Sequence, residues 1–201
     1  MKIICVGRNY SEHARELKNE TPEEPVLFMK SDTSILRNSE FYIPEFSNDI
    51  HYEVELLLKI SKPGKYIPQE NAHKYFQEIG LGIDFTARDL QSQLKAKGLP
   101  WEKAKSFDGS AVVSHFLPLE DFNREEIHFH LNKNKEKVQI GNSQNMIFSF
   151  DALVAYISKF FTLKTGDIIF TGTPAGVGKV NEGDILDGFL EDKKMFSVKI
   201  Y

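Results

Sequence analysis

Residues 52–60 read YEVELLLKI, a run that predicts a buried β-strand carrying two carboxylates. Side chains alternate between the two faces of a strand, so Glu53 and Glu55 project to one side while apolar residues such as Val54 and Leu56 line the other. Two neighbouring carboxylates that are partly withdrawn from water are costly unless a cation or a proton compensates them. The run therefore has two interpretations, a divalent-metal site or an ordinary amphipathic strand whose glutamates face water.

The composition indicates a globular protein without a polyanionic partner. The chain has 201 residues, 41% of them hydrophobic, which is enough to bury a sizeable core. Its net charge is only −4, and lysine and arginine are scattered among acidic residues, so neither nucleic acid nor an anionic membrane is expected as a partner. No window approaches the roughly 20 apolar residues of a membrane span. We therefore expect a cytoplasmic protein.

The cysteine and histidine residues of the sequence indicate which metal ion such a site would hold. Cys5 is the one cysteine, so the sequence predicts neither a disulfide framework nor a thiolate metal site. We interpret His128 and His130 as plain strand positions, because no third ligand lies near them in the sequence. A metal would then be held by carboxylates, which favours Mg²⁺, with Mn²⁺ as the alternative, over Zn²⁺.

Short strands dominate the rest of the pattern. Strands are predicted near residues 2–6, 26–30, 41–44, 79–85, 111–113, 127–132 and 137–140 and again within 167–201, and helices over 68–77, 87–97 and 150–161. Thr86 is the predicted N-cap of the second of these helices. Many short strands with a few helices favour an α+β fold over a doubly wound sheet.

One helical stripe adds a third acid to the glutamate pair. Asp84 closes the strand at 79–85, and if the following residues are helical, then Asp84, Arg88 and Gln91 lie at i, i+4 and i+7 on one face. The stripe is either a solvated helix face or a site in which Asp84 is a metal ligand and Arg88 and Gln91 bind a substrate carboxylate.

Two further segments carry groups that could take part in catalysis or ligand binding. Lys105 follows the single tryptophan and is either a surface lysine or, in a closed cleft, a cation that stabilises an enolate or oxyanion. Residues 166–178 read GDIIFTGTPAGVG, a tight glycine-rich loop that can approach a ligand closely and offers the Thr173 hydroxyl. This loop is not a phosphate-binding P-loop, because Val180 occupies the place of the metal-binding hydroxyl.

A polar segment near the N-terminus carries a candidate acid–base pair. Residues 9–24 are rich in charge and interrupted by proline, which indicates a surface element that could move. Within it, His13 and Glu16 lie at i and i+3, so one helical turn would bring them together as a hydrogen-bonded dyad.

Taken together, six motifs in order resemble the fumarylacetoacetate hydrolase family, and within it the short acylpyruvase and oxaloacetate decarboxylase type. They are VGRNY at 6–10 with His13 and Glu16, FMK at 28–30, EVE at 53–55, DFTARDLQ at 84–91, KGLPW at 97–101 with Lys105, and TGTPAGVG at 171–178. The resemblance implies a mixed β-sandwich or roll of the family's C-terminal-domain type with flanking helices. It also implies one catalytic domain over 1–201, a mobile lid near 9–25 and a homodimer.

The resemblance assigns a role to each candidate residue. The metal ligands fall on Glu53, Glu55 and Asp84, and the catalytic residues are His13, Glu16 and Lys105. The substrate-binding positions are Arg8, Lys30, Arg88, Gln91 and Thr173.

These assignments imply a Mg²⁺-dependent enzyme acting on a small 2-oxo acid. It would hydrolyse acylpyruvates to pyruvate and a carboxylate, decarboxylate oxaloacetate, or do both, with Lys105 stabilising an enolate and the His13–Glu16 dyad activating water. One alternative is an isomerase or tautomerase of an oxo-dicarboxylate in aromatic catabolism, which reprotonates the same enolate at another carbon. An alternative of another class is a noncatalytic ligand-binding module on a reused fold.

Overall fold

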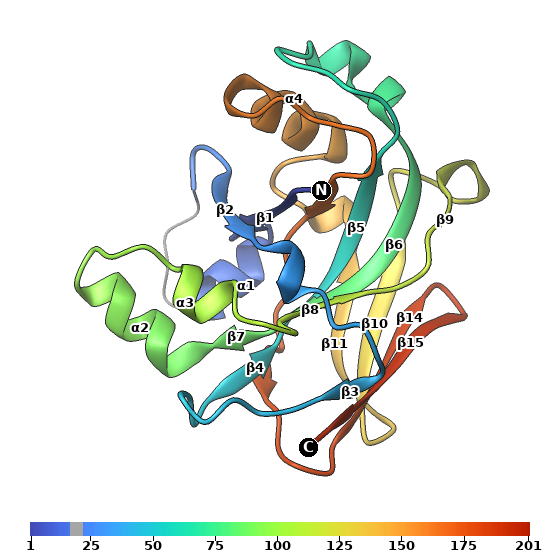
Figure 1. Cartoon of the computed structure of the whole chain (residues 1–201). Helices are drawn as coiled ribbons and strands as arrows, with labels where there is room; N and C mark the ends of the chain where they lie inside the picture. Colours follow the sequence, from blue (N-terminus) through green and yellow to red (C-terminus); the bar gives the residue numbers. More distant parts are fainter. Residues whose placement is uncertain (17–21) are drawn as a thin grey trace.

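The strands of the protein, seen here in a computed structural model that describes residues 1–16 and 22–201, form three sheets (Figure 1). The largest sheet has the strand order β2-β1-β12-β5-β6-β8, with β9 also paired to β6. Its strands are β1 (Ile3–Gly7), β2 (Val26–Lys30), β5 (Val54–Ile60), β6 (Phe76–Asp84), β8 (Ala111–Val113), β9 (Leu117–Pro118) and β12 (Ile168–Phe170).

The second sheet has the order β11-β10-β14-β15-β3, and the third has the order β13-β4-β7. The second is built from β3 (Glu40–Phe41), β10 (His128–Lys133), β11 (Glu136–Asn142), β14 (Ile185–Leu190) and β15 (Lys193–Ile200). The third is built from β4 (Ile50–Tyr52), β7 (Thr86–Ala87) and β13 (Gly178–Lys179).

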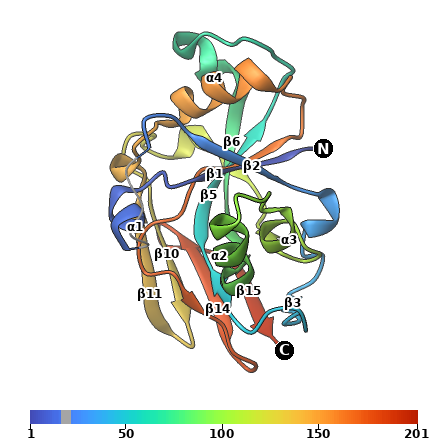
Figure 2. The ribbon, with the colours of Figure 1, turned by 90° about the vertical axis from the view of Figure 1, so that its left-hand side faces the viewer.

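Helices lie on the outside of the sheets. In Figure 2, α2 and α3 lie in front of the strands, α1 lies beside them, and α4 lies at the top. The α-helices are α1 (Ser11–Glu16), α2 (Arg88–Ala96), α3 (Glu102–Lys105) and α4 (Phe150–Phe160), and the 3₁₀ helices are η1 (Asp32–Ser34), η2 (Gln69–Tyr75), η3 (Leu119–Asp121) and η4 (Ser143–Asn145).

The core lies where the two larger sheets meet. Strands β14 and β15 contact β6, and β10 contacts β5. Leu56 and Ile83 from the first sheet are buried in one cluster with Leu131, Leu186 and Val198 from the second. Removing apolar surface from water at about 25 cal/mol per Å² is the main stabilising term for such packing. The α+β prediction, with a mixed β roll and flanking helices, is confirmed.

Strand β5 is buried on both faces. Val54 and Leu56 belong to the main core, whereas Leu57 packs in a second cluster with residues that include Cys5 and Phe170. The glutamate side of the strand is therefore covered by protein and does not face water. The interpretation of an amphipathic strand with solvated glutamates is thus wrong.

The predicted strand over 52–60 is interrupted at Glu53. Tyr52 pairs with Gly178 in the third sheet, whereas Val54 pairs with Ile83 in the first. The chain changes sheets between these residues, so Glu53 lies at the junction. The change depends on partners distant in sequence, which local alternation cannot reveal.

Two helix predictions also need correction. Residues 69–75 form a 3₁₀ helix, and the predicted helix over 68–77 ends early because Phe76 pairs with Ile60 as part of β6. Thr86 does not cap α2, since it pairs with His51 in β7 and α2 begins at Arg88. Asp84 is consequently the last residue of a strand and is not part of the helical stripe.

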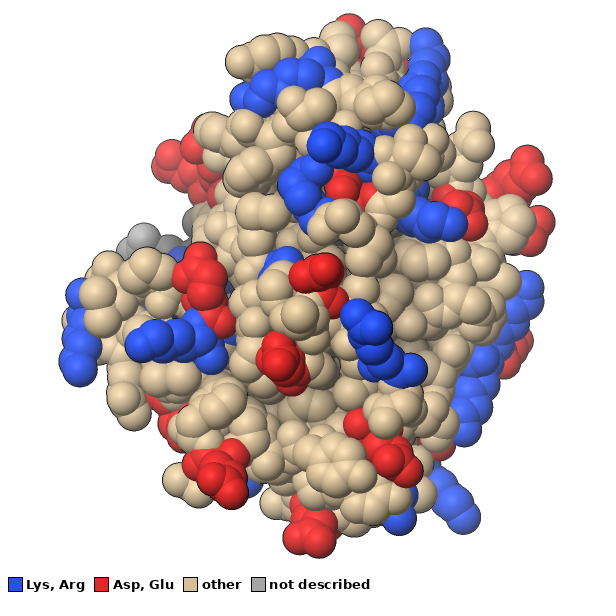
Figure 3. Space-filling model, viewed as in Figure 1, with Lys and Arg blue, Asp and Glu red and all other residues tan. Residues whose placement is uncertain are grey.

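The expected lid near 9–25 is only partly described. Its first half contains α1, and residues 17–21 lie outside the described residues. The mobility of this segment and the single-domain organisation of 1–201 stay predictions. Among residues 1–16 and 22–201, no helix is long and apolar enough to cross a membrane. On the face in Figure 3, basic and acidic side chains are interspersed, in keeping with the net charge of −4.

Gly82→Ala is expected to destabilise the protein because the strand beside the glutamates has no room for a side chain. An added Cβ would lie 2.4 Å from the Val112 carbonyl oxygen and 2.9 Å from Leu57 Cδ1. Overpacking of this kind costs about 1–3 kcal/mol, so the urea midpoint should fall with an unchanged m-value. Gly7→Ala is the matched control, because its Cβ would come no closer than 3.8 Å to Val26. Equal midpoints for the two variants would contradict the prediction.

Candidate active site

One cavity collects side chains from both ends of the sequence. It lies between the first sheet, helices α1 to α3 and the glycine-rich loop at 171–178. Its lining residues are Val6, Gly7, Arg8, His13, Phe28, Glu53, Glu55, Asp84, Arg88, Gln91, Lys95, Trp101, Lys105 and Thr173. All the predicted site residues except Glu16 and Lys30 are among them.

Three carboxylates converge in this cavity. Glu53, Glu55 and Asp84 each offer one oxygen, and these oxygens lie within 4.8 Å of one another. The three residues are only 4%, 2% and 0% exposed. Their convergence follows from sheet register, because β5 and β6 are neighbours and Glu55 pairs with Gly82, two residues before Asp84.

Lys105 bridges two of these carboxylates. Its buried ammonium donates to Glu53 Oε2 and Asp84 Oδ2, both at 2.7 Å, and to Thr86 Oγ1 at 2.6 Å. Burial alone would lower the pKa of Lys105, but the charges of Asp84 and Glu53 outweigh it and the pKa is raised. The side chain is therefore a fixed positive charge at neutral pH.

Arg88 binds the other oxygen of Glu53. Its Nη2 donates to Glu53 Oε1, and its Nη1 donates to Gln91 Oε1 at 2.7 Å. Burial would raise the pKa of Glu53, yet Lys105 and Arg88 hold it well below its usual range. Within the described residues Arg88 Nε has no hydrogen-bond partner, so this donor is available to a ligand.

Glu55 has the opposite electrostatic environment. Its Oε2 accepts a hydrogen bond from the Gly172 N–H at 2.7 Å, which favours the ionised form. Burial and the charges of Asp84 and Glu53 nevertheless raise the pKa of Glu55 well above the usual range for a glutamate. The ionised group needs a further cation.

The donor set fits a divalent metal ion. Carboxylate oxygens without thiolate or imidazole are the ligands of Mg²⁺ and Mn²⁺. Glu53, Glu55 and Asp84 supply three such oxygens close enough together to share one ion. An ion there would also compensate the charge of Glu55.

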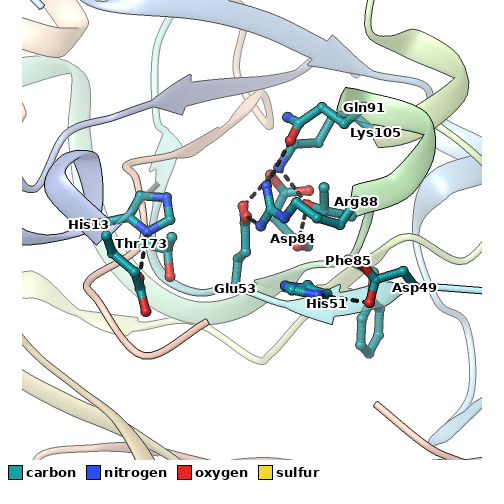
Figure 4. Close-up of polar contacts among 12 residues, drawn as sticks. His13, Asp49, His51, Glu53, Asp84, Phe85, Arg88, Gln91, Lys105 and Thr173 are labelled. Atoms are coloured by element: carbon teal, nitrogen blue, oxygen red, sulfur yellow. Dashed lines mark hydrogen bonds and ion pairs between the residues drawn. The ribbon is translucent and has the colours of Figure 1, made fainter. Parts of the chain in front are cut away.

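A histidine–glutamate pair occupies the opposite wall. Nδ1 of His13 lies 3.3 Å from Glu16 Oε2, so the two residues form the predicted contact. The Glu16 carboxylate also accepts the Gly176 N–H, at 3.1 and 3.2 Å, which ties α1 to the glycine-rich loop. Burial lowers the pKa of His13, so its imidazole is neutral at neutral pH. In Figure 4, Glu53 lies between His13 on one side and Arg88 on the other.

The loop and β1 complete the cavity. Thr173 is buried, and its hydroxyl oxygen accepts a hydrogen bond from Gln139 Nε2 at 2.9 Å. Arg8 has a φ of 62°, a left-handed conformation that is uncommon for a residue with a side chain. Arg8 Nε, like Arg88 Nε, is buried without a hydrogen-bond partner in the described part of the chain.

Lys30 lies behind the cavity and does not line it. Its Nζ is 2.8 Å from Asp84 Oδ1 and donates to Ser110 Oγ at 2.9 Å and to the carbonyl oxygen of Lys105. Lys30 thus contacts residues of the cavity wall and does not reach the space that a ligand would fill.

Five lining residues were not among the predicted site residues: Val6, Gly7, Phe28, Lys95 and Trp101. Lys95 follows Arg88 and Gln91 at i+7 and i+4, so helical periodicity alone could have added it to the stripe. Phe28 and Trp101 form an apolar wall, with ring centroids 6.0 Å apart. Their position depends on the packing of α3 against β2, for which the sequence carries no local signal.

Known proteins are similar to this chain over nearly its whole length. Residues 2–199 match the family described as fumarylacetoacetate (FAA) hydrolase C-terminal. The oxaloacetate tautomerase YcgM of Escherichia coli (strain K12) is 41% identical over 188 residues, covering 92% of this chain and 86% of that protein. A mitochondrial oxaloacetate decarboxylase of Dictyostelium discoideum is 43% identical over 190 residues, covering 92% and 86%.

A solved structure is similar over the whole chain. The crystal structure of fumarylpyruvate hydrolase from Pseudomonas aeruginosa, in complex with Mn²⁺ and pyruvate, matches with a TM-score of 0.94 and 34% identity. The match covers 100% of this chain and 89% of that one.

Glu55→Gln should have opposite effects on stability without and with metal. In chelator-treated protein at pH 8, the variant should unfold at a higher urea concentration, because the ionised carboxylate with its raised pKa is destabilising while the amide still accepts the Gly172 N–H. The gain should disappear at a pH below about 4, where Glu55 is protonated in both states.

With Mg²⁺ or Mn²⁺ at a hundredfold excess over its dissociation constant, the wild type should gain about 2.7 kcal/mol. The variant should gain much less, and equal gains would argue against this carboxylate as a ligand. Glu78→Gln is the control, since Glu78 lies on the surface in an ion pair with Lys59.

Proposed function

The chain belongs to the fumarylacetoacetate hydrolase family, and we propose that it is a divalent-metal-dependent enzyme that forms the enolate of oxaloacetate and interconverts its keto and enol forms. The observation that carries the proposal is the convergence of Glu53, Glu55 and Asp84 in a cavity beside a protonated Lys105. The tautomerase and decarboxylase names of the relatives support oxaloacetate as substrate. The complex of the P. aeruginosa enzyme with Mn²⁺ and pyruvate supports a 2-oxo acid ligand.

Glu53, Glu55 and Asp84 would hold Mg²⁺ or Mn²⁺. When bound, the ion supplies positive charge that stabilises an oxyanion on the 2-oxo group. Lys30 has a positioning role in this proposal, because its contact with Asp84 fixes that carboxylate from behind. This role replaces the substrate contact expected from the resemblance.

The substrate is oriented by donors from α2 and the loop. Arg88 Nε has no partner among residues 1–16 and 22–201, and Gln91 is hydrogen-bonded to Arg88, so together they offer donors to the substrate carboxylate. Thr173 adds a hydroxyl from the other side. Lys105 lies beside the carboxylates, where its fixed charge stabilises the enolate oxygen as it forms.

His13 accepts the C3 proton of the substrate and returns it. With its Nδ1–H donated to Glu16, the neutral imidazole has its lone pair on Nε2, which can accept a proton from C3 of the substrate. The C3–H bond breaks and its electrons form the C2–C3 double bond of the enolate. Protonation of the enolate on O2 by water gives the enol, and the hydroxide that remains takes the proton from Nε2, which restores the neutral imidazole and the water. In the reverse direction, water protonates Nε2, the hydroxide removes the O2 proton of the enol, and Nε2–H delivers its proton to C3 to give the keto acid.

Decarboxylation uses the same enolate. Here the C3–C4 bond of oxaloacetate breaks, its electrons pass into the enolate, and CO₂ leaves. His13 is not required for that bond cleavage. Protonation at C3 then yields pyruvate, so one site serves both reactions.

Acylpyruvate hydrolysis is the second candidate, and the presence of the His13–Glu16 dyad at the cavity favours it. The dyad would activate water to attack the C4 carbonyl, and cleavage of the C3–C4 bond would release the pyruvate enolate and a carboxylic acid. The sequence-based expectation is this carbon–carbon cleavage, with tautomerisation as the alternative. The names of the relatives support tautomerisation better. The isomerase alternative is the same proton transfer on a longer oxo-dicarboxylate.

Metal removal should abolish enol–keto conversion by the protein, and loss of Lys105 should slow it strongly. The decay of enol-oxaloacetate absorbance should be accelerated by the protein with Mg²⁺ or Mn²⁺ and return to the uncatalysed rate with EDTA. Lys105→Met should lower kcat by about 10²–10³, the usual effect of removing one oxyanion-stabilising group. Lys103→Met is the control from the exposed side of α3. Conversion that persists after metal removal would refute the mechanism, and a noncatalytic module would show no conversion under any condition.

His13→Ala should separate the reactions. Tautomerisation and acylpyruvate hydrolysis need the imidazole as a base, so both rates should fall by about 10²–10⁴. Oxaloacetate decarboxylation, followed by pyruvate release, should fall far less because its bond cleavage needs no base. Equal losses in all three reactions would argue that His13 acts through structure and not through proton transfer.

A further inference from the structure

We propose that Lys95, together with Arg8, binds the distal carboxylate of the substrate and thereby selects dicarboxylic 2-oxo acids over monocarboxylic ones. This inference rests on the proposed function, since it assigns the second anionic group of a substrate whose 2-oxo acid end lies at the carboxylate cluster. Lys95 is a specificity residue in this view.

The position of Lys95 follows from the geometry of α2. Arg88, Gln91 and Lys95 lie at i, i+3 and i+7, so one face of the helix directs all three into the cavity. With a rise of about 1.5 Å per residue, Lys95 lies roughly 10 Å further along the axis than Arg88. Lys95 therefore lines the cavity at a position further along α2 than Arg88, which contacts Glu53.

The cations of the cavity differ in their pairing. Arg88 and Lys105 are neutralised by Glu53, and Lys105 also by Asp84. Within residues 1–16 and 22–201, neither Arg8 nor Lys95 forms a salt bridge. Two of the four cations that line the cavity are thus paired with its carboxylates, whereas Arg8 and Lys95 have no carboxylate partner in the described part of the chain.

The surroundings of Lys95 keep its charge partly out of water. Its Nζ lies 5.1 Å from the centroid of the Trp101 ring, and Trp101 packs on Phe28. This apolar wall, together with the charges of Arg8 and Arg88, lowers the pKa of Lys95 to about 8. An anion held here would relieve both the desolvation and the repulsion between the cations.

Arg8 lines the same cavity from the end of β1. Its left-handed backbone conformation, φ 62°, fixes where the side chain leaves β1, and its buried Nε has no partner in the described residues. Arg8 and Lys95 line the same cavity, and the charge of Arg8 contributes to the lowered pKa of Lys95. Two cations that line one cavity can both donate to one carboxylate.

The chain's own charges favour a substrate with two negative groups. Arg8, Arg88, Lys95 and Lys105 line the cavity against Glu53, Glu55 and Asp84. A divalent cation on the three acids would leave the lining strongly positive. A dicarboxylate compensates that excess better than a monocarboxylate does, which is the physical basis of the selection.

The test compares oxaloacetate with pyruvate, which lacks the distal carboxylate. In Lys95→Gln with saturating Mg²⁺, KM for oxaloacetate should rise about tenfold or more while kcat changes less than about threefold, as expected for a lost charge-assisted contact. The inhibition constant of pyruvate should stay within about twofold. Lys95→Arg should restore most of the affinity, and Lys97→Gln, which removes an exposed charge from the end of α2, should behave as wild type.

Trp101 provides a readout that needs no turnover, because it is the single tryptophan and lines the cavity. Titrations followed by its fluorescence should show weaker oxaloacetate binding and unchanged pyruvate binding in Lys95→Gln. If the wild type does not convert oxaloacetate, the proposed function fails, and these titrations still decide the role of Lys95. Equal loss of both ligands, or no loss of either, would overturn the inference.

Discussion

The burial of three carboxylates is the constraint on which this structure depends. Ionised groups withdrawn from water must be paired, or their desolvation would exceed what the fold can tolerate. Here the pairing cations come from separate elements: Lys30 from β2, Arg88 from α2 and Lys105 from α3. Because each cation must reach the same pair of strands, the electrostatics of the acids also determine how these helices pack on the first sheet.

The cations of the chain do not fully compensate the three buried carboxylates, and the uncompensated negative charge makes the site reactive. Glu53 is held ionised, whereas Glu55 is driven toward protonation unless another cation arrives. On the opposite wall, His13 is kept neutral by burial and is thus able to take up a proton. A fixed positive charge beside a neutral base is the pairing that enolate chemistry needs.

Local patterns predicted the parts of the site that lie within a few residues of one another in the sequence. The i, i+2 spacing of Glu53 and Glu55 and the i, i+3 spacing of His13 and Glu16 both correspond to contacts that the structure contains. The break at Glu53 escaped prediction because it depends on Gln139, whose side-chain oxygen accepts the Val54 N–H at 2.9 Å from another sheet. The position of Lys30 behind Asp84 likewise depends on long-range packing. Helical periodicity predicted Arg88 and Gln91 as site residues, and the same periodicity predicts Lys95 one turn further along α2.

The contact between Glu16 and the Gly176 N–H links two functions that are usually described apart. The same carboxylate orients the imidazole of His13 and fastens the loop that presents Thr173. Gly176 has no room for a side chain, since a Cβ there would lie 2.4 Å from the Val138 carbonyl oxygen. The orientation of the imidazole and the position of the loop that carries Thr173 therefore depend on one carboxylate, so a substitution of Glu16 would disturb both walls of the cavity together.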